Sequence, residues 1–273
     1  MYQPIVEDIY KILTARKIRR AWPADPNAVK EVMDRSLKQD RRIVLTTNWL
    51  GVKTTERGTA DAVDETAVRF LQENIVDEVT KLKVDVLIKI LFMDVNASYF
   101  EGYPQKSIER YWDTLKPMFD GFGNNFKLIR ANAELWGNVF NLDERDDFSL
   151  DELAHKTDDM DILAETKCRV KDAIDSVHFP DIVKMAEKHS LFVKTKVLTG
   201  EEVAERYVNL RIFGRRRYKK MFPNEVFLSY LDPRINELIA AQPSVYIFSL
   251  RKGRSVSPWF VDESDPKHAI HGK

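Results

Sequence analysis

Residues 84–100, VDVLIKILFMDVNASYF, contain the strand on which the prediction of the fold rests. Only Asp85 and Lys89 interrupt its first, apolar part, which is rich in β-branched residues. A short run that is apolar on both alternating faces is typical of a strand buried on both sides, the central strand of a parallel sheet. The run ends at Asp94 and leads into a polar loop that contains Asn96. Ligands of open α/β sheets bind beyond the carboxyl ends of the strands, so Asp94 and Asn96 are candidate site residues; the alternative is that Asp94 caps a loop or helix.

Strand and helix patterns alternate on both sides of this segment. The predicted strands lie at 42–47, 84–93, 126–129, 226–230 and 244–250. The helices predicted between and before them lie at 4–20, 27–39, about 61–82, 105–120 and 199–222. Asp61 or Asp64 would cap the third of these helices, and Thr199 with Glu202 would form a capping box on the last. The alternation predicts an α/β fold, Rossmann-like, with a mainly parallel sheet flanked by helices.

The middle of the chain departs from this alternation. Between about 132 and 190 no strand pattern occurs, and helices are expected near 133–140, 150–157, 160–176 and 180–189. We therefore expect a helical insertion or cap over the edge of the sheet. The predicted organisation is a single α/β domain, 1–273, with N-terminal helices (1–40), a βαβ core (41–130), the helical insertion (131–198), a C-terminal helix and strands (199–261) and a flexible tail (262–273).

The composition favours a soluble protein without a metal or redox centre. The chain has 43 basic and 43 acidic residues, and this zero net charge gives no overall attraction to nucleic acid or membranes. Its one cysteine, Cys168, excludes an intramolecular disulfide, and its five histidines are scattered, so we expect no metal site. Neither a secretory signal nor an apolar run of roughly 20 residues is present, which favours a cytoplasmic location and no membrane partner. Glycine-rich nucleotide-binding motifs are absent as well, and no cofactor is expected.

Further positions carry groups suited to a small ligand. Lys53 lies in a polar loop after the first strand of the core, where its ammonium could bind a phosphate or carboxylate or react with a carbonyl; a solvated loop lysine is the alternative. On helix 199–222, Arg211 and Arg215 share a face. They could bind a substrate carboxylate or phosphate, the whole basic run of the helix could bind an RNA backbone, or the charges could simply complement the helix dipole. Trp259 follows a proline and could form a pocket wall or a core anchor.

Taken in order, the segments between Arg42 and Phe260 resemble the isonitrile (isocyanide) synthases of dityrosine and pyoverdine biosynthesis. That family has a loop ending in Lys-Ser, an acidic-capped helix, a strand ending in an aspartate-containing turn, a tyrosine-containing helix, an arginine-bearing helix and a TPWH segment. The matching stretches here are GVKT (with Lys53), GTADAVDETAVRFL, ILFMDVNASYF, SIERYWDTLKPMF, RRRYKKMFPNEVFLSYLDP and SPWF. The chain departs from the family where Leu231 and Phe260 replace histidines and Phe227 replaces an arginine. If those groups serve the chemistry, this chain keeps the scaffold while doing something else.

The resemblance implies an enzyme of secondary metabolism, a transferase or synthase that converts the amine of a free amino acid into an isonitrile with a pentose phosphate such as ribulose 5-phosphate. It implies that Lys53 meets the carbonyl or phosphate of the sugar and that Asp94 contacts the amino group. Arg211 or Arg215 would hold a carboxylate or phosphate. The remaining substrate contacts are expected at Asn96, Tyr111 and Trp259.

Two other interpretations stay open. The strand ending in ILFMD and the helix with Tyr111 also resemble the cyclodipeptide synthases, which join two aminoacyl groups from aminoacyl-tRNA on a synthetase-type Rossmann fold. In that family's reaction the basic run from Arg215 to Lys220 would bind the tRNA acceptor stem. Two features argue against this interpretation: the net charge is zero, and Thr46 and Thr47 stand where a nucleophilic serine is expected. The other interpretation is a non-catalytic binding protein, since a fold does not determine a function.

Overall fold

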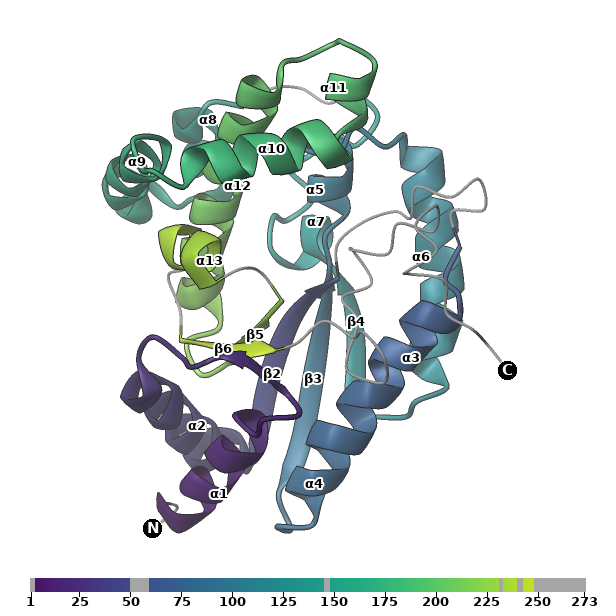
Figure 1. Cartoon of the computed structure of the whole chain (residues 1–273), viewed down its shortest axis with the longest axis vertical. Helices are drawn as coiled ribbons and strands as arrows, with labels where there is room; N and C mark the ends of the chain where they lie inside the picture. Colours follow the sequence, from purple (N-terminus) through teal and green to yellow (C-terminus); the bar gives the residue numbers. More distant parts are fainter. Residues whose placement is uncertain (1–2, 50–58, 145–147, 231–232, 240–242, 248–273) are drawn as a thin grey trace.

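The strands of the described chain form one six-stranded sheet. The computed structural model describes residues 3–49, 59–144, 148–230, 233–239 and 243–247. Within them the strand order is β1-β6-β5-β2-β3-β4 (Figure 1). Strands β6, β5, β2, β3 and β4 run parallel, and β1 pairs antiparallel with β6 at one edge. The strands are β1 (Arg19–Ala21), β2 (Arg42–Trp49), β3 (Asp85–Phe92), β4 (Phe126–Arg130), β5 (Val226–Ser229) and β6 (Ser244–Ile247). The predicted α/β fold with a mainly parallel sheet is confirmed.

Strand β3 is an interior strand, as its apolar pattern predicts. It pairs along its whole length with β2, and on its other side with β4. Its residues are buried except Asp85, which is exposed, and Lys89, which is half-buried. Its predicted central position is wrong, because β2, with β5 and β3 as its neighbours, lies nearer the middle of the sheet. A strand buried on both faces has the same apolar pattern at any interior position, so the pattern does not give the strand order.

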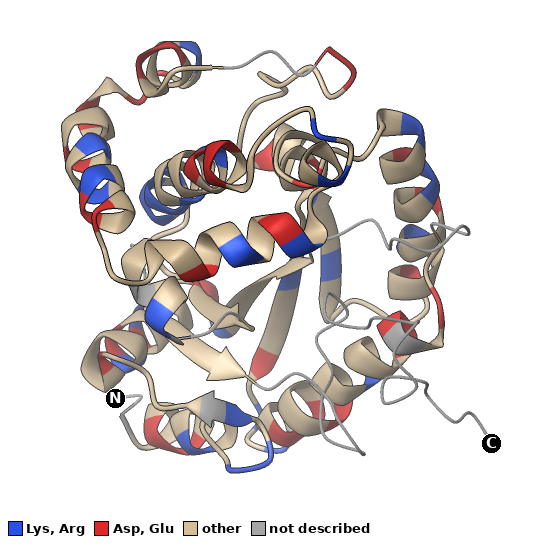
Figure 2. Ribbon diagram, turned by 45° about the horizontal axis from the view of Figure 1, so that its top comes forward, with Lys and Arg blue, Asp and Glu red and all other residues tan. Residues whose placement is uncertain are grey.

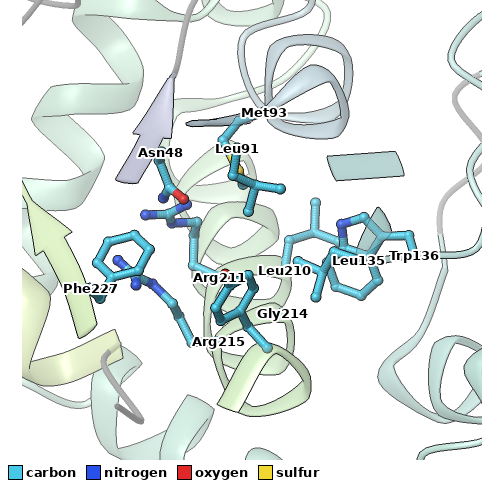
Figure 3. A pocket seen from close by; sticks show the side chains of 11 residues that line it. Asn48, Leu91, Met93, Leu135, Trp136, Leu210, Arg211, Gly214, Arg215 and Phe227 are labelled. Carbon is cyan, nitrogen blue, oxygen red and sulfur yellow. The ribbon is translucent and has the colours of Figure 1, made fainter. Parts of the chain in front are cut away.

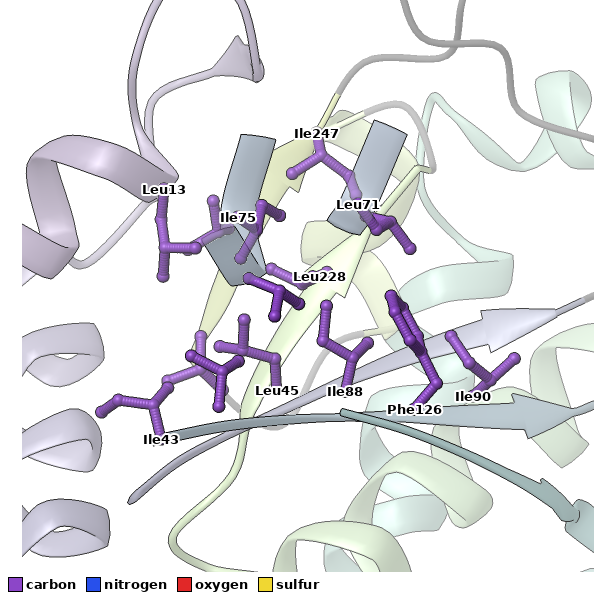
Figure 4. Close-up of a cluster of buried hydrophobic side chains, with 14 of the residues drawn as sticks. Leu13, Ile43, Leu45, Leu71, Ile75, Ile88, Ile90, Phe126, Leu228 and Ile247 are labelled. Carbon is purple, nitrogen blue, oxygen red and sulfur yellow. The ribbon is translucent and has the colours of Figure 1, made fainter. Parts of the chain in front are cut away.

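One face of the sheet carries a large hydrophobic core. Alternate strand residues such as Ile43, Ile88 and Leu228 pack there against apolar stripes of helices (Figure 4). A π-helical turn, Gln72–Val76, interrupts the helix predicted at 61–82, and Pro117 stays inside the helix predicted at 105–120. The helices of this face are α1 (Gln3–Leu13), α2 (Pro26–Asp40), α3 (Ala62–Leu71), α4 (Asp77–Thr80) and α6 (Gln105–Asp120).

Helix α12 (Gly200–Met221) packs on the other face of the sheet and joins it to the helical part of the chain. Its capping box, Thr199 with Glu202, forms as predicted. The helices predicted at 150–157, 160–176 and 180–189 are confirmed and pack with α12 in two further hydrophobic clusters. The helices around α12 are α7 (Ala131–Glu134), α8 (Leu150–Thr157), α9 (Met160–Ile174), α10 (Phe179–His189), α11 (Leu191–Lys194) and α13 (Pro233–Ile239) (Figure 1).

Three local predictions are wrong. The helix predicted at 4–20 ends at Leu13, where its apolar stripe ends, and residues 19–21 form the edge strand β1. The polar loop expected after β3 is a short buried helix, α5 (Asp94–Tyr99), whose first acidic side chain accepts a hydrogen bond from the backbone N–H of Val95. The helix expected at 133–140 is confined to α7, because Gly137 and Asn138 adopt left-handed φ angles of 62° and 60°.

The described helices include none that is long and apolar enough to cross a membrane. The predicted tail at 262–273 lies outside the described residues, as do Lys53 and Trp259.

Candidate functional site

A pocket lies where the carboxyl ends of β2 and β3 meet helix α12. Its lining residues are Asn48, Leu91, Met93, Leu135, Trp136, Leu210, Arg211, Gly214, Arg215, Tyr218 and Phe227 (Figure 3). The narrow space among these side chains is partly open to solvent. The pocket therefore occupies the edge of the sheet at which parallel α/β proteins bind their ligands.

Two arginines of α12 supply the charge of this pocket. Arg211 and Arg215 are one helical turn apart and only 3% and 4% exposed. With its amide oxygen turned toward α12, Asn48 accepts hydrogen bonds from Nη1 and Nη2 of Arg211, at 2.5 and 2.7 Å. The guanidinium of Arg215 stacks on the ring of Phe227, with its Cζ atom 3.3 Å from the ring centroid. The two side chains are thus held in place by a neutral amide and an aromatic ring (Figure 3).

The positive charge of these arginines has no acidic partner among the described residues. Arg215 makes no hydrogen bond there from Nε, Nη1 or Nη2, and Arg211 makes none from Nε. Glu225, which accepts a hydrogen bond from the pocket residue Tyr218, is already paired with Lys89. Burial, and secondly the neighbouring charge of Arg211, lower the pKa of Arg215 well below its ordinary value. Burying an unpaired charge costs several kcal/mol, so the geometry suits a ligand that brings negative charge.

Asp94 and Asn96 lie in α5, directly after β3, and each has one buried polar atom without a partner in the described chain. Asp94 is fully buried, and its Oδ1 accepts hydrogen bonds from the backbone N–H groups of Val95 and Asn132, both at 2.9 Å. Its Oδ2 has no such partner, and neither has Nδ2 of Asn96. Burial raises the pKa of Asp94 to about 6, against the opposing effect of the two hydrogen bonds. A carboxyl group of this kind can accept or release a proton near neutral pH.

Tyr111 lies on the opposite side of the sheet from the arginine pair. Its hydroxyl donates to Oδ1 of Asp64 at 2.8 Å and accepts from Nε1 of Trp49 at 3.2 Å. Trp49 follows Asn48 in β2, and successive residues of a strand point to opposite faces of the sheet. The structure therefore brings Arg211 and Arg215 together but separates them from Tyr111, which is fully buried in the first core.

Several pocket residues do not follow from the sequence patterns. Asn48 could have been found from the sequence, because it is a polar residue near the end of a strand, as Asp94 is in the neighbouring strand. No local sequence pattern places Trp136 or Tyr218 in a site, because each reaches the pocket only through tertiary packing. Phe227, a departure from the family pattern, lies against Arg215.

The rest of the basic run on α12 contacts the helical insertion. Arg216 pairs with Glu165, and Arg217 pairs with the buried Asp159. Lys220 binds Asp159 at 3.0 Å and Asp161 at 2.7 Å. These charges thus connect α12 to the N-terminal part of α9.

Comparison with known proteins gives a match at the level of structure. No family model matches the sequence, and no curated protein matches it either. The crystal structure of the PvcA protein from Pseudomonas aeruginosa superposes with a TM-score of 0.62, over 93% of this chain and 87% of that one. The two sequences are 12% identical over this alignment. The described chain and PvcA therefore share a fold.

Proposed function

We propose that this chain is a small-molecule biosynthetic enzyme of the isonitrile-synthase type, which binds the anionic group of its substrate between Arg211 and Arg215. The likeness of its fold to the isonitrile-synthase-like protein PvcA, over most of both chains, supports a distant relationship. The ordered sequence segments that resemble the family support the same relationship. The observation that carries the proposal is the guanidinium of Arg215, which is buried without an acidic or hydrogen-bonding partner in the described chain.

The arginine pair fits a carboxylate or phosphate by its chemistry. A guanidinium presents parallel N–H donors that match two oxygens of such an anion, and these charge-assisted hydrogen bonds are strong when water is excluded. A free amino acid supplies a carboxylate, and ribulose 5-phosphate supplies a phosphate. Asp94, with a pKa of about 6, is the proposed acceptor for a proton from the substrate amine. Lys53 stays a proposed contact of the sugar, and Asn96 and Trp259 stay proposed substrate contacts.

A tRNA-dependent reaction gains less support from the structure. Arg216, Arg217 and Lys220 are engaged by acidic residues of the insertion. In Figure 2, basic and acidic residues occur together on the helices. An RNA backbone is bound through many phosphate contacts, and a cation that already has an acidic partner contributes little to such binding.

Product analysis tests the proposal directly. The purified protein is incubated with an amino-acid mixture, once with ribulose 5-phosphate and once with charged tRNA, and small-molecule products are identified by mass spectrometry. We expect a product with one carbon more on the amine, formed only with the sugar phosphate. Arg215→Gln should abolish it, whereas Lys219→Gln, which removes an exposed charge from the same helix, should not.

Three results would contradict the proposal. A dipeptide-mass product that ribonuclease abolishes would assign the chain to the aminoacyl-tRNA class. Unchanged product formation by Arg215→Gln would remove the arginine pair from the substrate site. The absence of both product and ligand binding would favour the non-catalytic interpretation.

A further inference from the structure

Trp136 forms a wall of the same pocket and has a buried donor without a partner. The residue is 2% exposed, and its Nε1 makes no hydrogen bond within the described chain. Its ring stacks on Phe213, with a centroid distance of 5.9 Å and an interplanar angle of 15°, and meets Phe140 edge to face at 5.2 Å. These contacts hold the indole in one orientation. In Figure 3 it lies across the pocket from Phe227.

Gly214 allows the indole to approach α12 this closely. A Cβ atom at position 214 would lie 2.8 Å from Cζ2 of Trp136 and 3.2 Å from Cη2, closer than van der Waals contact permits. In an indole, Cζ2 and Nε1 are bonded to the same ring carbon, so they lie on the same edge of the ring. The N–H group therefore lies beside this contact with Gly214, the residue that directly precedes Arg215.

The buried side-chain atoms of this lining that have no hydrogen-bond partner among the described residues are all donors. They are Nε of Arg211, Nε, Nη1 and Nη2 of Arg215, and Nε1 of Trp136. The acceptors nearby are in use, since the amide oxygen of Asn48 binds Arg211 and the hydroxyl of Tyr218 donates to Glu225. A ligand that satisfies the lining must therefore bring acceptors only: an oxyanion for the guanidinium groups and one more acceptor for the indole N–H.

We propose that Trp136 is a specificity-determining residue. Arg211 and Arg215 bind the oxyanion of a small ligand, and the indole N–H of Trp136 donates a hydrogen bond to a neutral carbonyl or hydroxyl oxygen of the same ligand. Leu91, Leu135 and the Phe227 ring give this ligand a partly apolar body. This inference rests on the proposed anion site and adds to it the class of ligand: a small oxyanion with a neutral hydroxyl or carbonyl oxygen in the same pocket, as a sugar phosphate has.

A pair of matched probes tests this assignment. 3-Phenyllactate and 3-phenylpropionate have the same apolar body and the same carboxylate, and differ in one hydroxyl group. Isothermal titration calorimetry should show that the wild-type protein binds phenyllactate about tenfold more tightly, the value of one hydrogen bond that satisfies a buried donor. Trp136→Phe should remove this preference by weakening phenyllactate alone. Gly214→Ala, which displaces the indole, should do the same, whereas Trp112→Phe, outside the pocket lining, should keep the preference.

A spectroscopic measurement follows ligand binding in the wild-type protein itself and needs the Trp136→Phe variant only for assignment. In the wild-type protein labelled with ¹⁵N at its tryptophans, the indole N–H resonance that is missing in Trp136→Phe should move downfield with phenyllactate and much less with phenylpropionate. Equal weakening of both probes by Trp136→Phe would reduce the residue to a packing role and overturn the inference. A preference that survives Trp136→Phe, or the failure of both probes to bind the wild type, would also overturn it.

Arg215→Gln separates this inference from the proposed function. It should weaken both probes alike, because both carry the carboxylate. If Arg215→Gln weakens both and Trp136→Phe changes nothing, the anion site stands and the role of Trp136 falls. If Arg215→Gln changes neither, the anion site falls with the inference.

Discussion

Replacement of Arg215 by methionine should make the ligand-free protein more stable. Methionine keeps the length and flexibility of the side chain in a site that is 4% exposed, and removes a charge without an acidic partner in the described chain. An uncompensated buried charge costs about 3–5 kcal/mol. The stacking of Arg215 on Phe227, at 3.3 Å, offsets about 2 kcal/mol of this cost. The free energy of unfolding should therefore rise by about 1–3 kcal/mol, and Tm by about 2–10 °C.

The control for this prediction is Arg217→Met on the same helix. Arg217 pairs with the buried Asp159, which keeps Lys220 as a second partner, and donates to the backbone carbonyl of Thr157 at 2.8 Å, so its loss should lower stability by about 1–3 kcal/mol. Thermal and urea unfolding of both variants, measured at neutral pH without ligand, should give shifts of opposite sign. A similar loss of stability in Arg215→Met would refute the reasoning, because it would mean that Arg215 already has its counter-charge within the chain.

Three further outcomes follow from the described contacts. The pKa of Asp94 rises from 3.8 to about 6 on folding, so between those pH values the native state holds more protons than the unfolded state. The stability of the wild type relative to Asp94→Asn should thus fall by about 2 kcal/mol from pH 4 to pH 7. An unchanged difference between the two proteins in urea unfolding at the two pH values would contradict this. Tyr111→Phe should cost about 1–3 kcal/mol in urea unfolding, because Asp64 and Trp49 each lose a partner, while the affinity of the arginine pocket stays unchanged. Fluorescence anisotropy should detect no tight, salt-sensitive binding of tRNA. An affinity for tRNA that falls steeply with salt would contradict this, because it would mean that the ion pairs between Lys220 and the insertion break when RNA binds.

The parts of the fold that the sequence predicts are those determined by local periodicity. The apolar runs identify five of the strands, and the capping box and helical spacing place Arg211 and Arg215 on one face of α12. The edge strand β1 is missed, since three residues with the sequence RRA have no periodicity of their own and take their conformation from pairing with β6.

The site is predicted less well, because periodicity tells which residues share a face but not what covers it. On α12 the charges of Arg215 and Arg217 look alike in the sequence. Arg215 is buried against the neutral ring of Phe227, whereas Arg217 is paired with the carboxylate of Asp159, and only Arg215 therefore keeps its charge available for a ligand. Trp136 enters the pocket from a short helix followed by turns, through a contact that depends on the missing side chain of Gly214.

Helix α12 serves two parts of the molecule at once. Its C-terminal half carries both arginines of the pocket, and its N-terminal half is buried among α9 and α10, with Tyr207 and Val208 in their shared cluster. Because α12 is one continuous helix of 22 residues, its two halves move together when the helix is displaced as a unit. Mutations in the insertion can therefore shift the positions of the two charges without changing any residue that contacts the ligand. Descendants of this chain could thus diverge in substrate preference while every pocket residue stays the same.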